Sequence, residues 1–135
     1  MTIVSTIDDA DDARIVAEGK ALADAFGEEL HVVHVQDREE IEESVGKHGK
    51  RTAREEAAAT AATVAETVTD EFEAIGLLGN PAAEIDSYVD EVDARYLVVG
   101  GRKRTPIGKA LFGSVTQSVL LSVDTPVVTV RTGDT

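Results

Sequence analysis

Residues 95–130 constrain the fold of this chain more than any other stretch of its sequence. A short apolar run over 96–99 ends in Gly100 and Gly101, as a buried parallel strand does where the backbone turns sharply beneath a ligand. The segment over 102–109 that follows holds four of the chain's 13 lysines and arginines. This concentration of positive charge in an acidic protein favours a polyphosphate ligand, and the alternative is a solvated basic loop.

The apolar residues beyond this basic segment recur at helical spacing and predict a helix over about 110–122. Gly113 and Ser114 stand near its start, and Ser114 suits the N-cap position. Val115 and Thr116 would then present backbone N–H groups that have no partner within the helix. A helix N-terminus preceded by glycines is a favourable place for an anion, so this stretch predicts a phosphate site.

Along the whole chain, short β-branched runs alternate with amphipathic patterns, which predicts a single α/β domain over residues 1–135. Right-handed crossovers place helices on both faces of a parallel sheet, and ligands bind where the strand order reverses. The strand ends expected at that point carry Asp8, Val35 and Gly100. The expected strands cover 2–7, 30–35, 73–78, 96–99 and 127–130, and the expected helices cover 10–26, 51–73, a segment that begins at Pro81, and 110–122.

The spacing of Gly100, Gly113 and Ser114 resembles the nucleotide loop of the universal stress proteins, Gly-x2-Gly-x9-Gly-Ser/Thr. Lys103 stands where that pattern has its middle glycine. The resemblance extends over nearly the whole chain. It implies a three-layer α/β/α fold of the Rossmann-like, adenine nucleotide α-hydrolase-like type, with a five-stranded parallel sheet in the order 3-2-1-4-5. It also implies a dimer associated with stress survival.

The resemblance further implies a site for ATP with Mg²⁺, in which no side chain is catalytic and none binds the metal directly. Its residues would come from the ends of the first, second and fourth strands and from the loop and helix that follow. The residues expected in this site are Thr6, Ile7, Asp8, Val35, Val99, Gly100, Gly101, Arg102, Lys103, Gly113, Ser114, Val115 and Thr116.

Several of these residues have a structural interpretation beside the functional one. Asp8 and Ser114 suit helix caps, and Gly100 with Gly101 suits a plain turn. Lys103 would be strained if its position requires a positive φ. The universal stress proteins also include members that lack these glycines and do not bind ATP. Alternatively, its ammonium group points at the phosphates.

Three functions therefore stay open. The first is a nucleotide-binding stress-response module without robust turnover, and the second is a nucleotide-independent dimer that acts as a protein interaction module. The third, an adenylating enzyme, ranks last because its pyrophosphate loop would follow the first strand, where this chain has Asp-Asp-Ala-Asp-Asp. No His, Cys or Lys is placed as an evident base or nucleophile. His31 and His34, three residues apart on a strand, face opposite sides and cannot chelate one metal.

The chain carries 26 acidic residues against 13 basic ones, a formal net charge of -13. Nucleic acids and membrane surfaces are polyanions, so this balance argues against both as partners. Asp8 and Asp9 interrupt any apolar leader, and the chain has no cysteine, so we expect a cytoplasmic protein without disulfides. A charge this high indicates a salt-loaded cytoplasm, as in halophilic archaea, where screening removes the self-repulsion.

The apolar run from Val127 to Val130 would form a strand at one end of the sheet. An exposed apolar edge strand pairs readily with another chain. We therefore expect a homodimer in which this strand pairs with its two-fold mate.

The charge generates a prediction about salt. At low ionic strength the Debye length is ~10 Å or more, so the excess carboxylates repel one another across the folded surface. The midpoint of thermal unfolding should rise as KCl is increased from tens of millimolar to molar concentration. A midpoint that is flat or falls over that range would contradict the halophilic interpretation.

Overall fold

A computed structural model describes residues 1–37, 50–101 and 113–132 of the chain. Five parallel strands form one sheet in the order β3-β2-β1-β4-β5, which confirms the predicted fold class. The strands are β1 (Thr2–Thr6), β2 (Glu29–Gln36), β3 (Glu73–Leu78), β4 (Ala94–Gly101) and β5 (Val127–Arg131). The described helices are α1 (Ala13–Phe26), preceded by the 3-10 turn η1 (Ala10–Asp12), α3 (Lys50–Glu66), α4 (Pro81–Glu91) and α5 (Ser114–Ser122).

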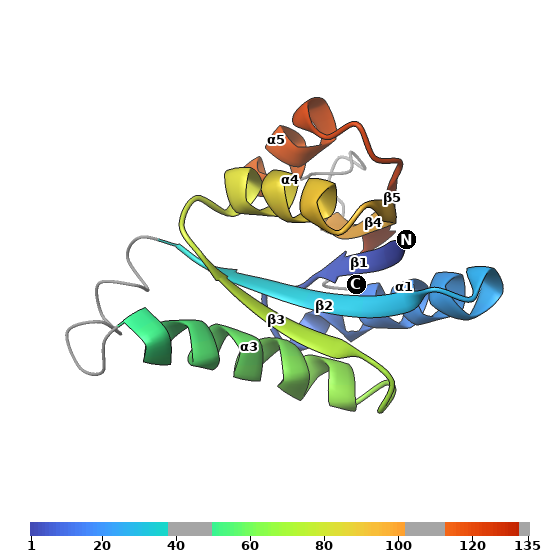
Figure 1. Cartoon of the computed structure of the whole chain (residues 1–135), viewed down its shortest axis with the longest axis horizontal. Helices are drawn as coiled ribbons and strands as arrows, with labels where there is room; N and C mark the ends of the chain where they lie inside the picture. The colour runs from blue at the N-terminus through green and yellow to red at the C-terminus, as the bar shows by residue number, and fades with distance from the viewer. Residues whose placement is uncertain (38–49, 102–112, 133–135) are drawn as a thin grey trace, which may run out of the picture.

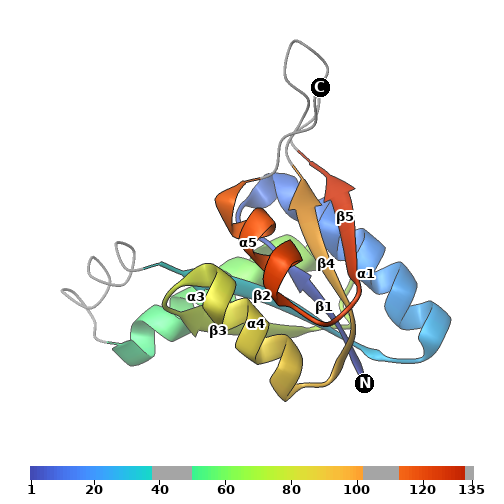
Figure 2. The ribbon, with the colours of Figure 1, turned by 90° about the horizontal axis from the view of Figure 1, so that it is seen from above.

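The helices cover both faces of this sheet. α1 and α3 lie on one face, and α4 and α5 lie on the other (Figure 1). The arrowheads of β1, β4 and β5 point toward the same end of the sheet, where α1 and α5 begin (Figure 2). None of the helices in the described residues is both long and apolar enough to cross a bilayer.

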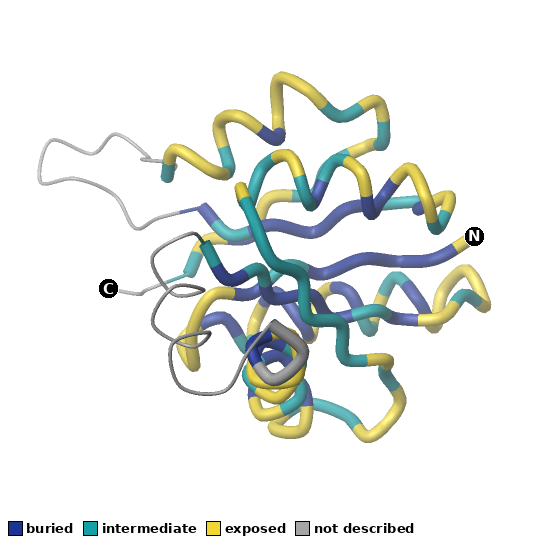
Figure 3. The backbone as a smooth tube through the Cα atoms, turned by 60° about the vertical axis from the view of Figure 1, so that its left-hand side comes forward, coloured by how far each residue is buried: buried dark blue, intermediate teal, exposed yellow. Residues whose placement is uncertain are grey.

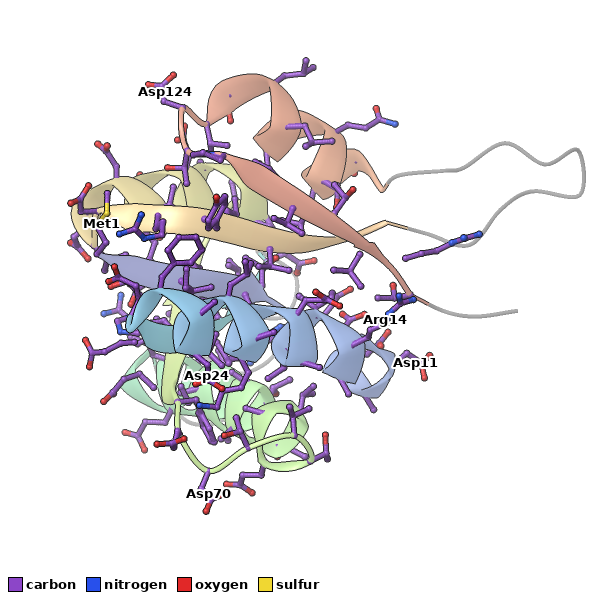
Figure 4. The ribbon with its side chains drawn as sticks, turned by 90° about the vertical axis from the view of Figure 1, so that its right-hand side faces the viewer. Met1, Asp11, Arg14, Asp24, Asp70 and Asp124 are labelled. Atoms are coloured by element: carbon purple, nitrogen blue, oxygen red, sulfur yellow. The ribbon has the colours of Figure 1, made fainter. Side chains whose placement is uncertain are left out.

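Two apolar cores follow from the alternation of side chains along the buried strands. Ile3, Val32 and Val98 belong to the core beneath α1 and α3, whereas the next residues along, Val4, Val33 and Leu97, belong to the core beneath α4 and α5. Figure 3 shows the buried backbone of the sheet between helices whose outer sides are exposed. A strand buried on both faces reads as a continuous apolar run, which is why the sequence identified these strands.

Two small residues let the helices of the first face approach the sheet closely. A Cβ on Gly19 in α1 would lie 2.1 Å from Ser5 Oγ, and one on Gly76 in β3 would lie 2.2 Å from the Arg54 carbonyl oxygen in α3. Any larger residue at Gly76 would push α3, whose buried side chains are mostly alanine, away from the sheet.

Capping residues stand at three of the helix ends. The structural interpretation of Asp8 as a helix cap was wrong by one residue, because the N-cap is Asp9. Asp9 caps η1 in a capping box with Asp12, which satisfies N–H groups at the start of this helical segment. Gly27 ends α1 in the left-handed conformation with φ 65°. Asn80 caps α4 by accepting a hydrogen bond from Ala83 N at 3.0 Å.

The predicted end of the second helix was wrong, because α3 stops at Glu66 and not near residue 73. Thr67 turns the chain: its N–H and its hydroxyl both donate to the Val64 carbonyl, at 3.2 and 2.7 Å. Val68 and Phe72 lie within the predicted range of the helix, but they pack against the core from the connection to β3. Apolar spacing alone does not distinguish these two arrangements.

Candidate functional site

A cavity of about 400 Å³ lies at the carboxyl end of the sheet. β1 and β4 pair side by side there, but the chain leaves β1 for α1 on one face, and α5, which follows β4, lies on the other. This is the reversal point at which open α/β sheets bind ligands. The cavity is lined by Thr6, Ile7, Asp8, Asp9, Asp12, Ile15, Val33, Val35, Asp37, Pro81, Ile85, Gly100, Gly101, Gly113, Ser114, Val115, Thr116 and Thr132.

The N-terminus of α5 forms one wall of the cavity. Its hydrogen bonding begins with Gln117 N, which donates to the Gly113 carbonyl at 3.0 Å. The N–H groups of Ser114, Val115 and Thr116 therefore have no partner within the helix, and they carry the positive end of its dipole. Gly113, and not Ser114, is the N-cap, with extended φ and ψ and no side-chain cap. The predicted capping role of Ser114 was wrong: Ser114 is the first helical residue, and it is exposed.

Gly100 and Gly101 form the floor of the cavity within β4. We expected the strand to end at Val99 in a glycine turn, but β4 continues through Gly101 and pairs with β5 there. Close packing explains why position 100 is a glycine, since a Cβ there would lie 2.8 Å from Ile15 Cδ1 in α1. Gly100 thus lets α1 pack against the end of β4.

Two threonines fix this floor. The Thr116 hydroxyl donates to the Gly100 carbonyl at 3.0 Å, and the Thr132 hydroxyl donates to the Gly101 carbonyl at 3.3 Å. Thr132 N also donates to the Gly101 carbonyl, at 2.9 Å. These bonds join the start of α5 and the end of β5 to consecutive residues of β4.

The wall on the side of β2 and α4 is apolar, with Val33, Val35, Pro81 and Ile85. The neighbouring Ile7 is held by two bonds to β2: its N–H donates to the Val33 carbonyl at 2.9 Å, and its carbonyl lies 3.1 Å from His34 Nδ1. A flat, apolar ligand group such as a base is suited to this wall.

The two histidines of β2 face opposite sides of the sheet, as predicted. His34 is buried against the Ile7 carbonyl, and His31 Nδ1 lies 2.6 Å from the Tyr88 hydroxyl on the other face of the sheet. Burial raises the pKa of that Tyr88 hydroxyl to about 12, and the nearby Glu91, Glu73 and Glu29 add to the rise. The described residues contain no group of three or more His, Cys, Asp or Glu arranged to hold a metal ion.

The wall that follows β1 is acidic and is organised by Asp12. Asp12 is only 9% exposed, and its Oδ2 accepts hydrogen bonds from Asp8 N at 2.7 Å and Asp9 N at 3.3 Å. Burial raises the pKa of the Asp12 carboxyl above its ordinary value, and the Asp9 and Asp8 carboxylates add to the rise, whereas the two backbone N–H groups oppose it.

Most of the residues predicted for the site do line the cavity. Val99 does not: it is 2% exposed and belongs to the core beneath α4 and α5. Arg102 and Lys103 lie outside the described residues, as does the expected start of the last helix before Gly113. The predicted residues that line the cavity are Thr6, Ile7, Asp8, Val35, Gly100, Gly101, Gly113, Ser114, Val115 and Thr116.

Eight further lining residues were not predicted. We interpreted the acids after β1 only as favourable charges at a helix start, although the same position brings Asp12 to the strand ends. Asp37 and Thr132 could have been identified, because each follows the carboxyl end of a predicted parallel strand. The unpredicted residues are Asp9, Asp12, Ile15, Val33, Asp37, Pro81, Ile85 and Thr132.

The sheet order and a cavity with a helix N-terminus at the strand reversal define an α/β protein of the nucleotide-binding architecture. The model of the universal stress protein family matches residues 1–131, so the chain belongs to this family. A universal stress protein of Mycolicibacterium smegmatis is 46% identical over 48 residues, which are 36% of this chain and 37% of that protein.

Solved structures agree with this assignment. The structure of a universal stress protein from Archaeoglobus fulgidus is 29% identical and has a TM-score of 0.74, with 96% of this chain and 97% of that chain covered. A structure of the universal stress protein from the same organism in complex with dAMP is 25% identical, with a TM-score of 0.66 and 96% of each chain covered.

The buried Asp12 generates a prediction about stability and pH. Its pKa is raised in the folded protein above the ordinary value of 3.8, so ionising Asp12 costs folding free energy that is absent at low pH and appears as pH rises. Asp12→Asn keeps an acceptor for the two N–H groups and removes this cost. The variant should melt at a higher temperature than the parent at pH 7, and the difference should shrink as pH falls toward 4. A difference that does not change with pH would contradict this account.

Proposed function

We propose that this chain is a stress-response module that binds ATP at the carboxyl end of its sheet without robust turnover. The observation that carries the proposal is the cavity at the reversal point, where the free N–H groups at the start of α5 face an apolar wall from β2 and α4. The first wall suits phosphates and the second suits a base.

The family and its structures support an adenine nucleotide as the ligand. A relative in Archaeoglobus fulgidus is described in complex with dAMP. Of the adenine nucleotides, ATP has the most phosphate oxygens to accept hydrogen bonds from the start of α5, and the sequence between Gly101 and Gly113 carries four cationic residues. Mg²⁺ would be bound by phosphate oxygens and water, as is usual for this ion.

The absence of turnover is part of the proposal and follows from the side chains near the ligand. Among the described residues that line the cavity, the ionisable groups are four aspartates, and there is no histidine, lysine or cysteine. No aspartate there forms the base-and-nucleophile pair that would activate a group for attack on a phosphate.

Calorimetry with ATP and Mg²⁺, in the salt that keeps the protein folded, tests the proposal. Gly113→Val should abolish binding because its side chain would occupy the space in front of the N–H groups. Ser114→Ala should weaken binding by ~1–2 kcal/mol, the usual worth of a hydrogen bond to a charged group. Ser122→Ala, at the exposed far end of α5, is the matched control and should bind as the parent does. ADP and AMP should bind less tightly than ATP.

The variant Lys103→Gly tests how a lysine at the position of the family's middle glycine affects nucleotide binding. Tighter binding would mean that Lys103 obstructs a loop that glycine shapes, and weaker binding would mean that its ammonium group contacts the phosphates. If the parent binds no ATP at millimolar concentration, the protein is a nucleotide-independent interaction module.

We also propose that the protein forms a homodimer through β5. Within the described residues β5 is an edge strand that pairs with β4 alone, and its Val127 and Val128 are partly exposed. Pairing with a second copy would satisfy the open edge. Light scattering in molar salt should give twice the 14.3 kDa of one chain.

The proposed dimer can be tested by introducing a lysine on the edge strand and, as a control, a lysine elsewhere on the surface. Thr129→Lys places a cation at the exposed middle residue of β5. If the two copies pair about the centre of this strand, the two cations would lie close together and repel, so the variant should dissociate at micromolar concentration. Ser122→Lys makes the same charge change at the end of α5 and should leave the dimer intact. A parent that is a monomer at micromolar concentration would exclude this assembly.

A further inference from the structure

The strand β3 forms the second edge of the sheet, and part of its backbone faces away from β2. Gly79 N, just beyond this strand, donates to the Gln36 carbonyl of β2 at 3.0 Å, so the backbone groups of Gly79 face β2. Along a strand paired in parallel, alternate residues direct their backbone N–H and carbonyl groups to the same neighbour. Ile75 and Leu77 therefore also face β2. The residues of β3 that face outward are Ala74, Gly76 and Leu78.

These outward backbone groups are unpaired in the part of the chain that the structure describes. No hydrogen bond from another described segment reaches Ala74, Gly76 or Leu78. All five residues over 74–78 are partly exposed. Figure 1 shows β3 in front of β2, with α4 above it and α3 below it, so the two helices flank this edge and do not cover it.

The sequence of β3 lacks the usual protections of an edge strand. Such strands are commonly very short, or are interrupted by lysine, proline or a bulge. β3 has six residues, Glu-Ala-Ile-Gly-Leu-Leu, of which only the first is charged, and its register with β2 is unbroken. The opposite edge strand, β5, has five residues, follows Pro126 and ends at the charged Arg131. β3 can therefore accept a further strand along its whole length.

A further strand would also extend the apolar core beneath α4. The side chains of Ile75 and Leu77 pack against that core but stay partly exposed. A strand added at this edge would place alternate side chains beside them, at the distance of cross-strand neighbours. An extended segment with apolar residues at every second position suits this surface.

The start of β3 is acidic. Glu29 and Glu73 line a cavity of about 450 Å³ there, and neither forms an ion pair within the described residues. The lysine that lines this cavity, Lys20, is already bound by Asp24 and Glu71, at 2.6 and 2.9 Å. A cationic residue of an incoming segment would therefore meet carboxylates that have no partner.

The other end of β3 is acidic as well, and this selects the kind of partner. A Cβ at Gly79 would lie 3.3 Å from the Glu84 carboxylate at the start of α4. A second copy of this chain, with its net charge of -13, would bring like charge to this edge. An extended segment with lysine or arginine toward its ends brings complementary charge.

We propose that the outer edge of β3 binds an extended, basic segment of a partner protein, which joins the sheet as a sixth strand. The backbone of β3 supplies the hydrogen bonds, and the carboxylates near its two ends select the cationic residues of the segment. This inference does not depend on the nucleotide site, because β3 contributes no residue to that cavity among the described ones.

The experiment uses the full chain, labelled with nitrogen-15, and the synthetic peptide Lys-Val-Thr-Val-Thr-Val-Lys with blocked termini, in the salt that keeps the protein folded. NMR measures the hydrogen exchange of each backbone N–H. Without peptide, the three outward amides of β3 should exchange faster than those of Ile75 and Leu77, which are bonded to β2. Saturating peptide should slow the outward amides by about tenfold or more, and its titration gives the dissociation constant.

Two proline variants test which edge is used. Ala74→Pro removes an outward N–H and keeps the pairing with β2, because an edge strand tolerates proline where the N–H faces away from the sheet. Its affinity for the peptide should fall by about tenfold or more. Thr129→Pro is the matched control: it removes an outward N–H of β5, since Thr132 N, three residues on, faces Gly101. In this variant the peptide should protect the β3 amides with parental affinity.

Two further peptides test the parent alone, so the inference stays testable if Ala74→Pro does not fold. Lys-Val-Pro-Pro-Pro-Val-Lys has the same charge but cannot form a strand, and it should leave the outward amides unprotected. Glu-Val-Thr-Val-Thr-Val-Glu should bind about tenfold or more weakly than the lysine peptide, because its charges repel those at the ends of β3.

Several results would overturn the inference. They are a lysine peptide that leaves the outward amides of β3 unprotected, a proline peptide that binds equally well, which would show charge attraction alone, and a loss of affinity in Thr129→Pro but not in Ala74→Pro. Outward amides that are already protected without peptide, together with a lower mass by light scattering for Ala74→Pro, would show that a second copy of the chain occupies this edge.

Discussion

The parallel pairing of β1 with β4 is the constraint on which the rest of the molecule depends. Val4 faces Leu97 and Ser5 faces Val98 across this pair, so the two strands together supply the centre of both apolar cores. The helices connected to these strands lie on opposite faces of the sheet and cannot meet above their carboxyl ends. A hollow is therefore left between them, and the residues that begin α1 and α5 form two of its walls. The strand order by itself therefore produces the cavity at this end of the sheet.

The low content of aromatic residues makes close approach the main means of packing. Aromatic residues make up 4% of the chain, so small and β-branched side chains must fill the space between sheet and helices. Gly19, Gly76 and the alanines of α3 allow this, and the Ser5 hydroxyl donates to the Ile15 carbonyl at 3.0 Å where α1 lies nearest to β1. Helices held this close have little freedom to shift, so the positions of their first turns are set by the core.

The strands could be predicted from the sequence because they follow from apolar patterns that repeat. The sheet order and most of the cavity wall were predicted from the resemblance to the universal stress proteins. The end of α3 could not be predicted, since Val68 and Phe72 continue the helical spacing after the Thr67 hydroxyl has ended the helix. Val99 was misplaced because neighbouring residues of a strand face opposite sides, so its position next to Gly100 does not bring it into the cavity. Asp12 was missed for a different reason: an acid at a helix start has an adequate local explanation, and the sequence does not show that this acid is buried.

The two threonine bonds at the floor of the cavity have a mechanical consequence. Thr116 and Thr132 attach the first turn of α5 and the end of the edge strand to adjacent carbonyl groups of β4. A force that displaces the edge strand is therefore transmitted through two peptide groups to the helix that faces the cavity. Displacement of the edge strand would therefore be coupled to the floor of the cavity through these hydrogen bonds, without rearrangement of either apolar core.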